Sequence, residues 1–129
     1  MKNSKVEICF IGNAIVDILS KISNETLNKL EIPKGSMQLV DEEFSDKILK
    51  YIKDPSIISG GSAANTAVGF KSFGGTCSFI GQIGNDKFGD LFSKDLNNSG
   101  IFFKSKNFQS TDKTSKSIIL VTPDAERSM

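Results

Sequence analysis

Apolar and polar residues alternate along the chain in two patterns that predict two kinds of element. Short apolar runs bounded by glycine or polar residues predict strands, and apolar residues recurring every three or four positions predict amphipathic helices. The predicted strands are residues 6–11, 15–22, 37–40, 76–83, 101–103 and 117–121. The predicted helices are residues 24–30, 41–53, 62–73 and 86–96. Strands that alternate with helices favour an α/β layered fold with parallel strand pairing.

Residues with turn and cap chemistry mark the ends of several elements. Asp41 is expected to cap the helix that follows it, and Pro55 to end that helix. The polar stretch 109–116 is predicted to be a loop. Residues 122–125 predict a turn after a strand, and residues 126–129 begin an element for which no partner is expected, which would leave a strand edge exposed.

Composition narrows the class of protein but does not identify it. The 129 residues are 38% hydrophobic and 24% charged, with a formal net charge of +1. Basic residues are scattered, so no nucleic-acid partner is expected, and no apolar run approaches the ~20 residues of a membrane span. The expected location is the cytoplasm.

Cysteine and histidine usage limits the chemistry further. Cys9 and Cys77 lie in apolar runs and are expected to be buried thiols in a reducing compartment. No metal-binding spacing is present, and the absence of histidine excludes a Ser-His-Asp or Cys-His site within these residues.

The strongest local feature is the segment from Gly60 through Asn65, which joins a strand to a helix. Gly60 and Gly61 allow a positive φ and a close approach of the backbone to a ligand. The first N–H groups of the helix are unpaired, and Asn65 can offer both a donor and an acceptor at the same end. The segment suits a hydroxyl-rich or anionic ligand. The alternative is a tight connection with an alanine-rich packing face.

A second candidate site follows the first predicted strand. Asn13 and Asp17 lie where ligands bind in open α/β sheets, and a carboxylate accepts two sugar hydroxyls well. The alternative is a turn asparagine with a capping aspartate. By contrast, residues 81–89 lack the spacing of a nucleotide-binding loop. Asn85 or Asp86 is expected to cap a helix there, with the glycines serving the turn.

Taken together, these motifs resemble the first signature of the PfkB carbohydrate kinases, a family that includes ribokinase, fructokinase and adenosine kinase. The matching positions are Gly60, Gly61, Asn65, Ala67, Gly74 and Gly84. The segment 12–17 resembles the opening strand of the family, and segments 34–41 and 122–129 resemble its adenosine-kinase-like branch.

The resemblance implies a fold and a set of substrate-binding residues. The implied fold is an incomplete ribokinase-like three-layer α/β/α sheet with part of a small β lid. Residues 1–129 would be the N-terminal part of one kinase domain, with lid strands near 36–40 and 101–129. The residues implied to bind the acceptor are Asn13, Asp17, Gly60, Gly61, Ser62 and Asn65.

The second signature of the family, a Gly-Ala-Gly-Asp segment, does not occur in residues 1–129. In the family it supplies the catalytic base, so no catalytic residue is assigned, and the residues for ATP and Mg²⁺ are not expected in this chain. The sequence thus predicts the acceptor-binding part of an ATP-dependent sugar or nucleoside kinase, inactive alone. The alternative is a non-catalytic sugar- or nucleoside-binding fragment. A dinucleotide-binding oxidoreductase domain is disfavoured because the glycine fingerprint is missing. The expected partner is a small sugar or nucleoside, and a homodimer through the lid is left open.

Overall fold

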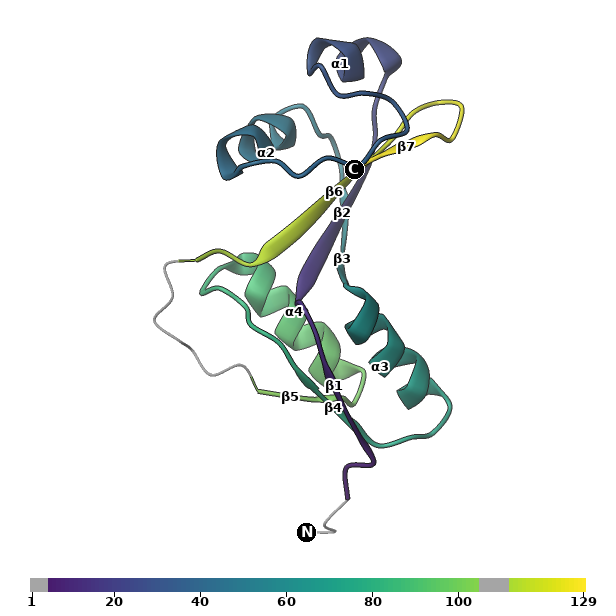
Figure 1. Cartoon of the computed structure of the whole chain (residues 1–129), viewed down its shortest axis with the longest axis vertical. Helices are drawn as coiled ribbons and strands as arrows, with labels where there is room; N and C mark the ends of the chain where they lie inside the picture. Colours follow the sequence, from purple (N-terminus) through teal and green to yellow (C-terminus); the bar gives the residue numbers. More distant parts are fainter. Residues whose placement is uncertain (1–4, 105–111) are drawn as a thin grey trace. The chain divides into compact units, whose positions relative to one another are not determined.

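A computed structural model of the chain describes residues 5–104 and 112–129, and contains four helices and two sheets (Figure 1). The helices are α1 (Asn24–Lys29), α2 (Glu42–Leu49), α3 (Ser62–Ser72) and α4 (Lys87–Asn98). The strands are β1 (Ile8–Ile11), β2 (Ile15–Lys21), β3 (Ser56–Gly60), β4 (Cys77–Ile80), β5 (Phe102–Phe103), β6 (Ser115–Val121) and β7 (Arg127–Ser128). The chain divides into two compact units. Unit 1 comprises residues 1–16 and 58–116, and unit 2 residues 17–57 and 117–129.

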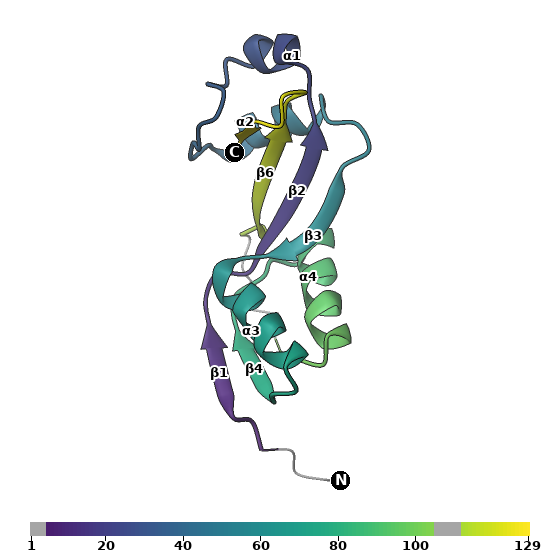
Figure 2. The same ribbon diagram turned by 90° about the vertical axis from the view of Figure 1, so that its right-hand side faces the viewer.

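Unit 1 is built on a three-stranded sheet of order β1-β4-β5, whose neighbouring strands run parallel. Helices α3 and α4 accompany this sheet (Figures 1 and 2). Phe79 of β4, Phe92 of α4 and Phe103 of β5 pack against one another, with ring centroids 5.5–5.8 Å apart. On the same face, the ring of Phe10 packs against Phe70 of α3. This aromatic cluster fixes the two helices on one face of the sheet.

The side chains that point to the opposite face of this sheet are largely exposed. Ile11 is 72% exposed, Ile80 56% and Phe102 60%. The sequence predicted a buried strand over residues 6–11. The predicted burial is wrong for the β1 side chains that lie on this exposed face. Cys9 lies on this face and is exposed, whereas Cys77 is buried, so the expectation of two buried thiols holds only for Cys77.

Unit 2 contains α1, α2 and most of the four-stranded sheet of order β3-β2-β6-β7. Its core is aliphatic, and its most buried members are Ile18, Leu27, Leu30, Ile48 and Leu120. Each helix begins at a side-chain cap: Ser23 accepts from the N–H of Thr26, and Asp41 accepts from that of Phe44. The predicted cap at Asp41 is confirmed.

Strand β7 pairs antiparallel with β6, with Leu120 opposite Ser128. The prediction that residues 126–129 would lack a partner is therefore wrong. The turn over residues 122–125 closes this hairpin, and the N–H of Ala125 donates to the carbonyl of Thr122.

Three further predictions differ from the structure. No strand forms at residues 37–40, although the N–H of Gln38 donates to the carbonyl of Met129. Helix α2 ends at Leu49 because the chain turns more tightly there: the N–H groups of Tyr51 and Ile52 donate to carbonyls three residues back. The predicted loop 109–116 is partly a strand, since β6 begins at Ser115, and residues 109–111 lie outside the described residues.

Candidate acceptor-binding site

The N-terminus of α3 is an unusual helix start because no side chain caps it. The N-cap is Gly61, with φ of 91°, and it makes no side-chain cap hydrogen bond. Ser62 and Asn65, on the first turn of this helix, are exposed, and Gly60 is buried. The first N–H groups of a helix lack partners within the helix, so this end offers donors to an anionic or hydroxyl-rich group.

Gly61 also lies against the backbone of the segment that follows β1. A Cβ built on Gly61 would be 2.7 Å from the carbonyl oxygen of Asn13, and a Cβ built on Gly12 would be 2.7 Å from the Cβ of Ala63. Glycine at both positions allows the two segments to touch. Among the predicted substrate-binding residues, Asn13 thus lies against Gly61, and Gly60, Ser62 and Asn65 belong to the same unit.

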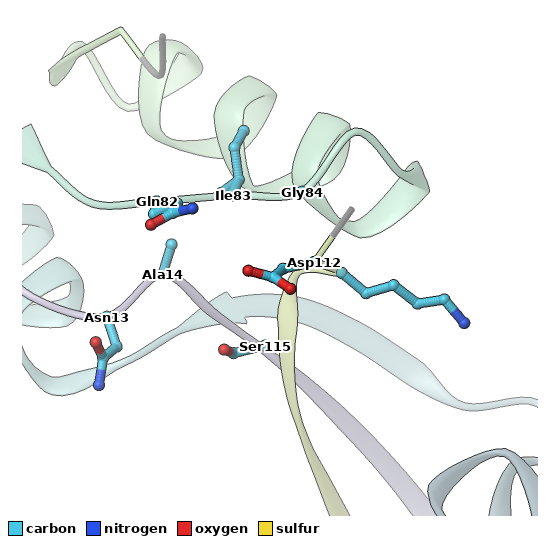
Figure 3. Close-up of a pocket in the computed structure, with 8 residues that line it drawn as sticks. Asn13, Ala14, Gln82, Ile83, Gly84, Asp112 and Ser115 are labelled. Carbon is cyan, nitrogen blue, oxygen red and sulfur yellow. The ribbon is translucent and has the colours of Figure 1, made fainter. Parts of the chain in front are cut away.

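A polar pocket opens beside Asn13 (Figure 3). Its volume is about 220 Å³. It is lined by Asn13, Ala14, Gln82, Ile83, Gly84, Asp112, Lys113 and Ser115. The carboxylate of Asp112 and the hydroxyl of Ser115 point from one side toward the space beside Ala14, and Gln82 lies on the opposite side (Figure 3). Of these residues, the sequence had indicated only Asn13 as a binding residue.

One wall of the pocket is held in place by Asp86. Its carboxylate caps α4 by accepting from the N–H groups of Phe88 and Gly89, which confirms one of the two predicted caps. The same carboxylate accepts from the backbone N–H and the hydroxyl of Thr114, each at 2.8 Å. The hydroxyl of Thr114 accepts in turn from the N–H of Gly84 at 2.9 Å. We call Gly84, Asp86 and Thr114 the clamp.

The clamp depends on close backbone contacts. A Cβ on Gly84 would be 2.5 Å from the carbonyl oxygen of Asp112, and one on Gly89 would be 2.3 Å from that of Gly84. Burial alone would raise the pKa of Asp86, but the hydrogen bonds from Thr114, Gly89 and Phe88 outweigh burial and hold the pKa below its usual value of 3.8. Asp86 is therefore ionised at neutral pH and acts as a structural acceptor.

Asp17 belongs to unit 2, as the third residue of β2. Val16 and Ile18 on either side of it are buried, and Asp17 faces the other way with partial exposure. Desolvation raises the pKa of its carboxyl group. None of the described residues donates a hydrogen bond to it. A partly buried carboxylate without a donor retains its capacity to accept hydrogen bonds from a ligand.

The part of the chain that the structure describes contains neither a cluster of potential metal ligands nor a membrane-spanning helix. Within residues 5–104 and 112–129, no group of three or more His, Cys, Asp or Glu side chains is placed to hold a metal ion. We assign no residue of this part of the chain to Mg²⁺ or ATP. In the same part of the chain, no helix combines the length and apolar character required to cross a bilayer.

Sequence comparison identifies the family of this chain. Residues 35–129 match the pfkB family of carbohydrate kinases. The chain belongs to this family. Among curated relatives, a fructokinase from Escherichia coli is 36% identical over 69 residues, which cover 54% of this chain and 22% of that protein. A probable fructokinase of Arabidopsis thaliana is 31% identical over 77 residues, covering 60% of this chain and 22% of that protein. The matched stretches span about a fifth of these relatives.

Solved structures extend the similarity over nearly the whole chain. A probable sugar kinase from Rhizobium etli is 34% identical to this chain, with a TM-score of 0.81. The match covers 95% of this chain and 37% of that protein. An adenosine kinase from Sinorhizobium meliloti is 35% identical, with a TM-score of 0.81, and 96% of this chain covers 38% of it. The predicted fold class, a partial ribokinase-like α/β fold, is confirmed.

The pocket lining and the clamp are the features that sequence reasoning missed. Gln82 and Gly84 lie in the segment interpreted as a helix cap and turn, which is correct for Asp86 but incomplete. The sequence predicted residues 109–116 only as a polar loop, and this segment contains Asp112, Lys113 and Ser115 of the pocket lining. No local pattern links these two segments, because the hydrogen bonds between Asp86 and Thr114 join residues 28 positions apart.

Proposed function

We infer that this chain provides the acceptor-binding part of an ATP-dependent sugar or nucleoside kinase. Family membership supports phosphoryl transfer to an alcohol group as the reaction class of the complete enzyme. The observation that carries the acceptor-binding role is the carboxylate of Asp17, which is partly buried and has no donor among the described residues. Burying a carboxylate without a partner costs free energy, and a substrate hydroxyl is a natural donor for it.

The uncapped start of α3 supports the same role from unit 1. Gly61 leaves the first N–H groups of the helix without a side-chain acceptor, and the exposed amide of Asn65 adds a donor and an acceptor nearby. Donors in fixed positions bind a hydroxyl or a charged oxygen without a cost for reorganisation. Asn13, Gly60 and Ser62 complete the proposed set of acceptor-binding residues.

The test is a binding measurement on the 129-residue chain. Asp17→Asn keeps the size of the side chain but removes the charge that accepts two hydroxyls. We expect it to weaken binding of the acceptor by about 10- to 100-fold, since hydrogen bonds to charged groups contribute about 1.5–3 kcal/mol. Binding is followed by NMR titration with D-fructose, D-ribose and adenosine.

The matched control is Asp54→Asn, in the same unit. Asp54 is exposed and has a φ of 46°, a conformation that asparagine tolerates well. This control variant should bind the acceptor as the unchanged protein does. If Asp17→Asn binds every acceptor with unchanged affinity, or if the unchanged chain binds none of the three, the acceptor-binding role is wrong.

The remaining proposals concern the complete enzyme. ATP and Mg²⁺ would be the cofactors, and a small sugar or nucleoside the substrate. An adenosine kinase from Schistosoma mansoni, 25% identical with a TM-score of 0.77, was solved in complex with 2-fluoroadenosine. A cytoplasmic location and a homodimer formed through lid strands also stay proposals. The second candidate function is a sugar- or nucleoside-binding fragment without catalysis.

A further inference from the structure

The face of the β1-β4-β5 sheet that lies opposite to α3 and α4 is apolar. Its side chains alternate along each strand with those that face the helices, and they are those of Cys9, Ile11, Ser78, Ile80 and Phe102. The three large ones are each more than half exposed. Parallel sheets are almost always covered on both faces. This face, which we call the open face, therefore lacks a covering layer in the part of one chain that the structure describes.

Strand register arranges these five side chains in two rows across the sheet. Cys9 pairs with Ser78, and Ser78 with Phe102, so the first row runs from two small side chains to one large ring. Ile11 pairs with Ile80 in the second row. None of the five is an Asp, Glu, Lys or Arg. Like-charge repulsion between these side chains therefore does not oppose contact between two such faces.

The order of sizes in the first row makes the open face complementary to a second copy of itself. When a two-fold axis runs parallel to the strands and along β4, β1 of one copy lies over β5 of its partner. The ring of Phe102 then lies over the partner's Cys9, a large side chain over a small one, and Ile80 lies over the partner's Ile80. Sheets that pack face to face keep their strands roughly aligned, as this arrangement does.

The same symmetry limits the assembly to two copies. The opposite face of the sheet carries α3 and α4, so each copy offers the open face once (Figures 1 and 2). A contact between identical faces around a two-fold axis closes on itself, whereas a contact between two different surfaces can continue into a filament. Removal of the apolar side chains from water provides the driving force.

We propose that two copies of the 129-residue chain pack their open faces against each other, with Phe102 of each copy on the partner's Cys9 and Ile80 at the centre of the contact. This goes beyond the proposed function, because it involves neither Asp17 nor the start of α3. It also differs from a dimer formed through strands of unit 2, which would leave the open face in water. The contact is reversible, so Cys9 is accessible in the free copy.

Sedimentation equilibrium of the whole chain over a series of concentrations tests the contact. We expect the mass to rise from the 14.0 kDa of one chain to twice that value and to level there. Ile80→Lys should raise the dimer Kd by at least about tenfold, because it places two ammonium groups at the centre of an apolar contact. Ile58→Lys is the matched control, since Ile58 is 54% exposed against 56% for Ile80 but lies on β3. It should change the Kd by less than about twofold.

A disulfide reports which side chains meet in the dimer. In Phe102→Cys, the new thiol should lie over the partner's Cys9, and oxidation by air with copper phenanthroline should join the two copies between positions 9 and 102. Positions 9 and 102 of one copy cannot be bridged, because β4 separates β1 from β5 by about 9–10 Å, beyond the reach of a disulfide. The control is Phe73→Cys, at the end of α3, which should give no bridge between positions 9 and 73.

Three results would overturn the proposal. The mass could stay at that of one chain up to about 1 mM, where even weak complexes form, or rise beyond twice that mass. Ile80→Lys could dimerise as tightly as the unchanged chain, which would place the contact on another surface. Oxidised Phe102→Cys could lack the bridge between positions 9 and 102, a result that decides the matter if Ile80→Lys fails to fold. Asp17→Asn should dimerise as the unchanged chain does, so this proposal and the acceptor-binding role fail separately.

Discussion

The carboxylate of Asp86 accepts hydrogen bonds from the start of its own helix and from Thr114, 28 residues further along the chain. One side chain therefore both begins α4 and attaches the segment that leads into β6. A helix cap is normally a local device, whereas this one also fixes a wall of the polar pocket. Its contribution to stability should exceed that of an ordinary cap.

Replacing Asp86 tests this double role. Asp86→Ala removes the cap, worth about 1 kcal/mol, and the bonds from Thr114 to a charged group, worth about 1.5–3 kcal/mol. We expect the free energy of unfolding to fall by about 2–4 kcal/mol in urea denaturation. Asp41→Ala is the control, because Asp41 caps α2 through one bond to Phe44, and it should cost only about 1 kcal/mol. Equal losses in the two variants would show that Thr114 adds nothing.

The same clamp predicts a pH dependence of stability. The pKa of Asp86 in the folded chain lies below the usual 3.8, so the ionised carboxylate stabilises the fold at all pH values above about 3.8. This stabilisation declines as the pH falls below 3.8 and is lost once the pH passes the lower folded-state pKa. The stability difference between the unchanged chain and Asp86→Ala should therefore shrink over that acidic range. A difference that stays constant down to pH 2 would contradict the assignment.

Gly61 and Gly74 offer a matched pair for testing the turn before α3. Both have φ near 90°, but a Cβ on Gly61 would meet the Asn13 carbonyl at 2.7 Å, whereas one on Gly74 meets nothing within 4 Å. Gly74→Ala should cost about 1–2 kcal/mol for the left-handed backbone alone. Gly61→Ala should cost about 1–3 kcal/mol more because of the crowding. Thermal unfolding of the two variants measures the difference, and similar losses would mean that the contact with Asn13 relaxes freely.

The two cysteines should differ strongly in reactivity. Cys9 is exposed, while Cys77 is 4% exposed and its thiol donates to the carbonyl of Ala67. Burial raises the pKa of the Cys77 thiol, which lowers the thiolate fraction further. A maleimide should label Cys9 in the folded chain and Cys77 only after unfolding, and Cys9→Ser should abolish the folded-state reaction. Rapid labelling of Cys77 in the folded Cys9→Ser variant would show that the core opens readily.

The sequence predicted elements well where local chemistry decides them. All four helices were found, because each combines an amphipathic or alanine-rich pattern with a cap or a glycine stop, as at Asp41 and Gly74. Local patterns failed where the partner is distant. The apolar pattern of residues 37–40 predicts a strand, yet the backbone there is held by a hydrogen bond to the carbonyl of Met129. The pairing of β7 with β6 could not be predicted from the last few residues alone.

Burial was also harder to predict than secondary structure. The apolar run of β1 is typical of a strand covered on both faces, but helices α3 and α4 pack on one face only, which leaves Ile11, Ile80 and Phe102 exposed. For the candidate site, glycine and asparagine at the start of α3 were visible as a motif. Gln82 and Ser115 were not, because only the fold brings residues 82–84 and 112–115 to the same pocket.

The final prediction is that residues 1–129 alone have no kinase activity. Catalysis of phosphoryl transfer depends on a base near the acceptor hydroxyl and on groups that stabilise the charge of the transferring phosphoryl. The Gly-Ala-Gly-Asp segment that resemblance to the family assigns to this task does not occur in these residues, and the chain has no histidine. Asp17, the proposed ligand of the acceptor hydroxyls, would be engaged in binding.

Purified chain should be incubated with ATP, magnesium and a panel of adenosine, inosine, D-ribose and D-fructose, and ADP formation compared with a control without protein. We expect no acceptor-dependent ADP. Acceptor-dependent ADP that disappears in Asp17→Asn but persists in Asp54→Asn would show that the chain holds a complete active site. In that case a carboxylate of this chain, Asp17 included, would take the proton of the acceptor hydroxyl, because positioning of the acceptor by itself leaves that proton without an acceptor.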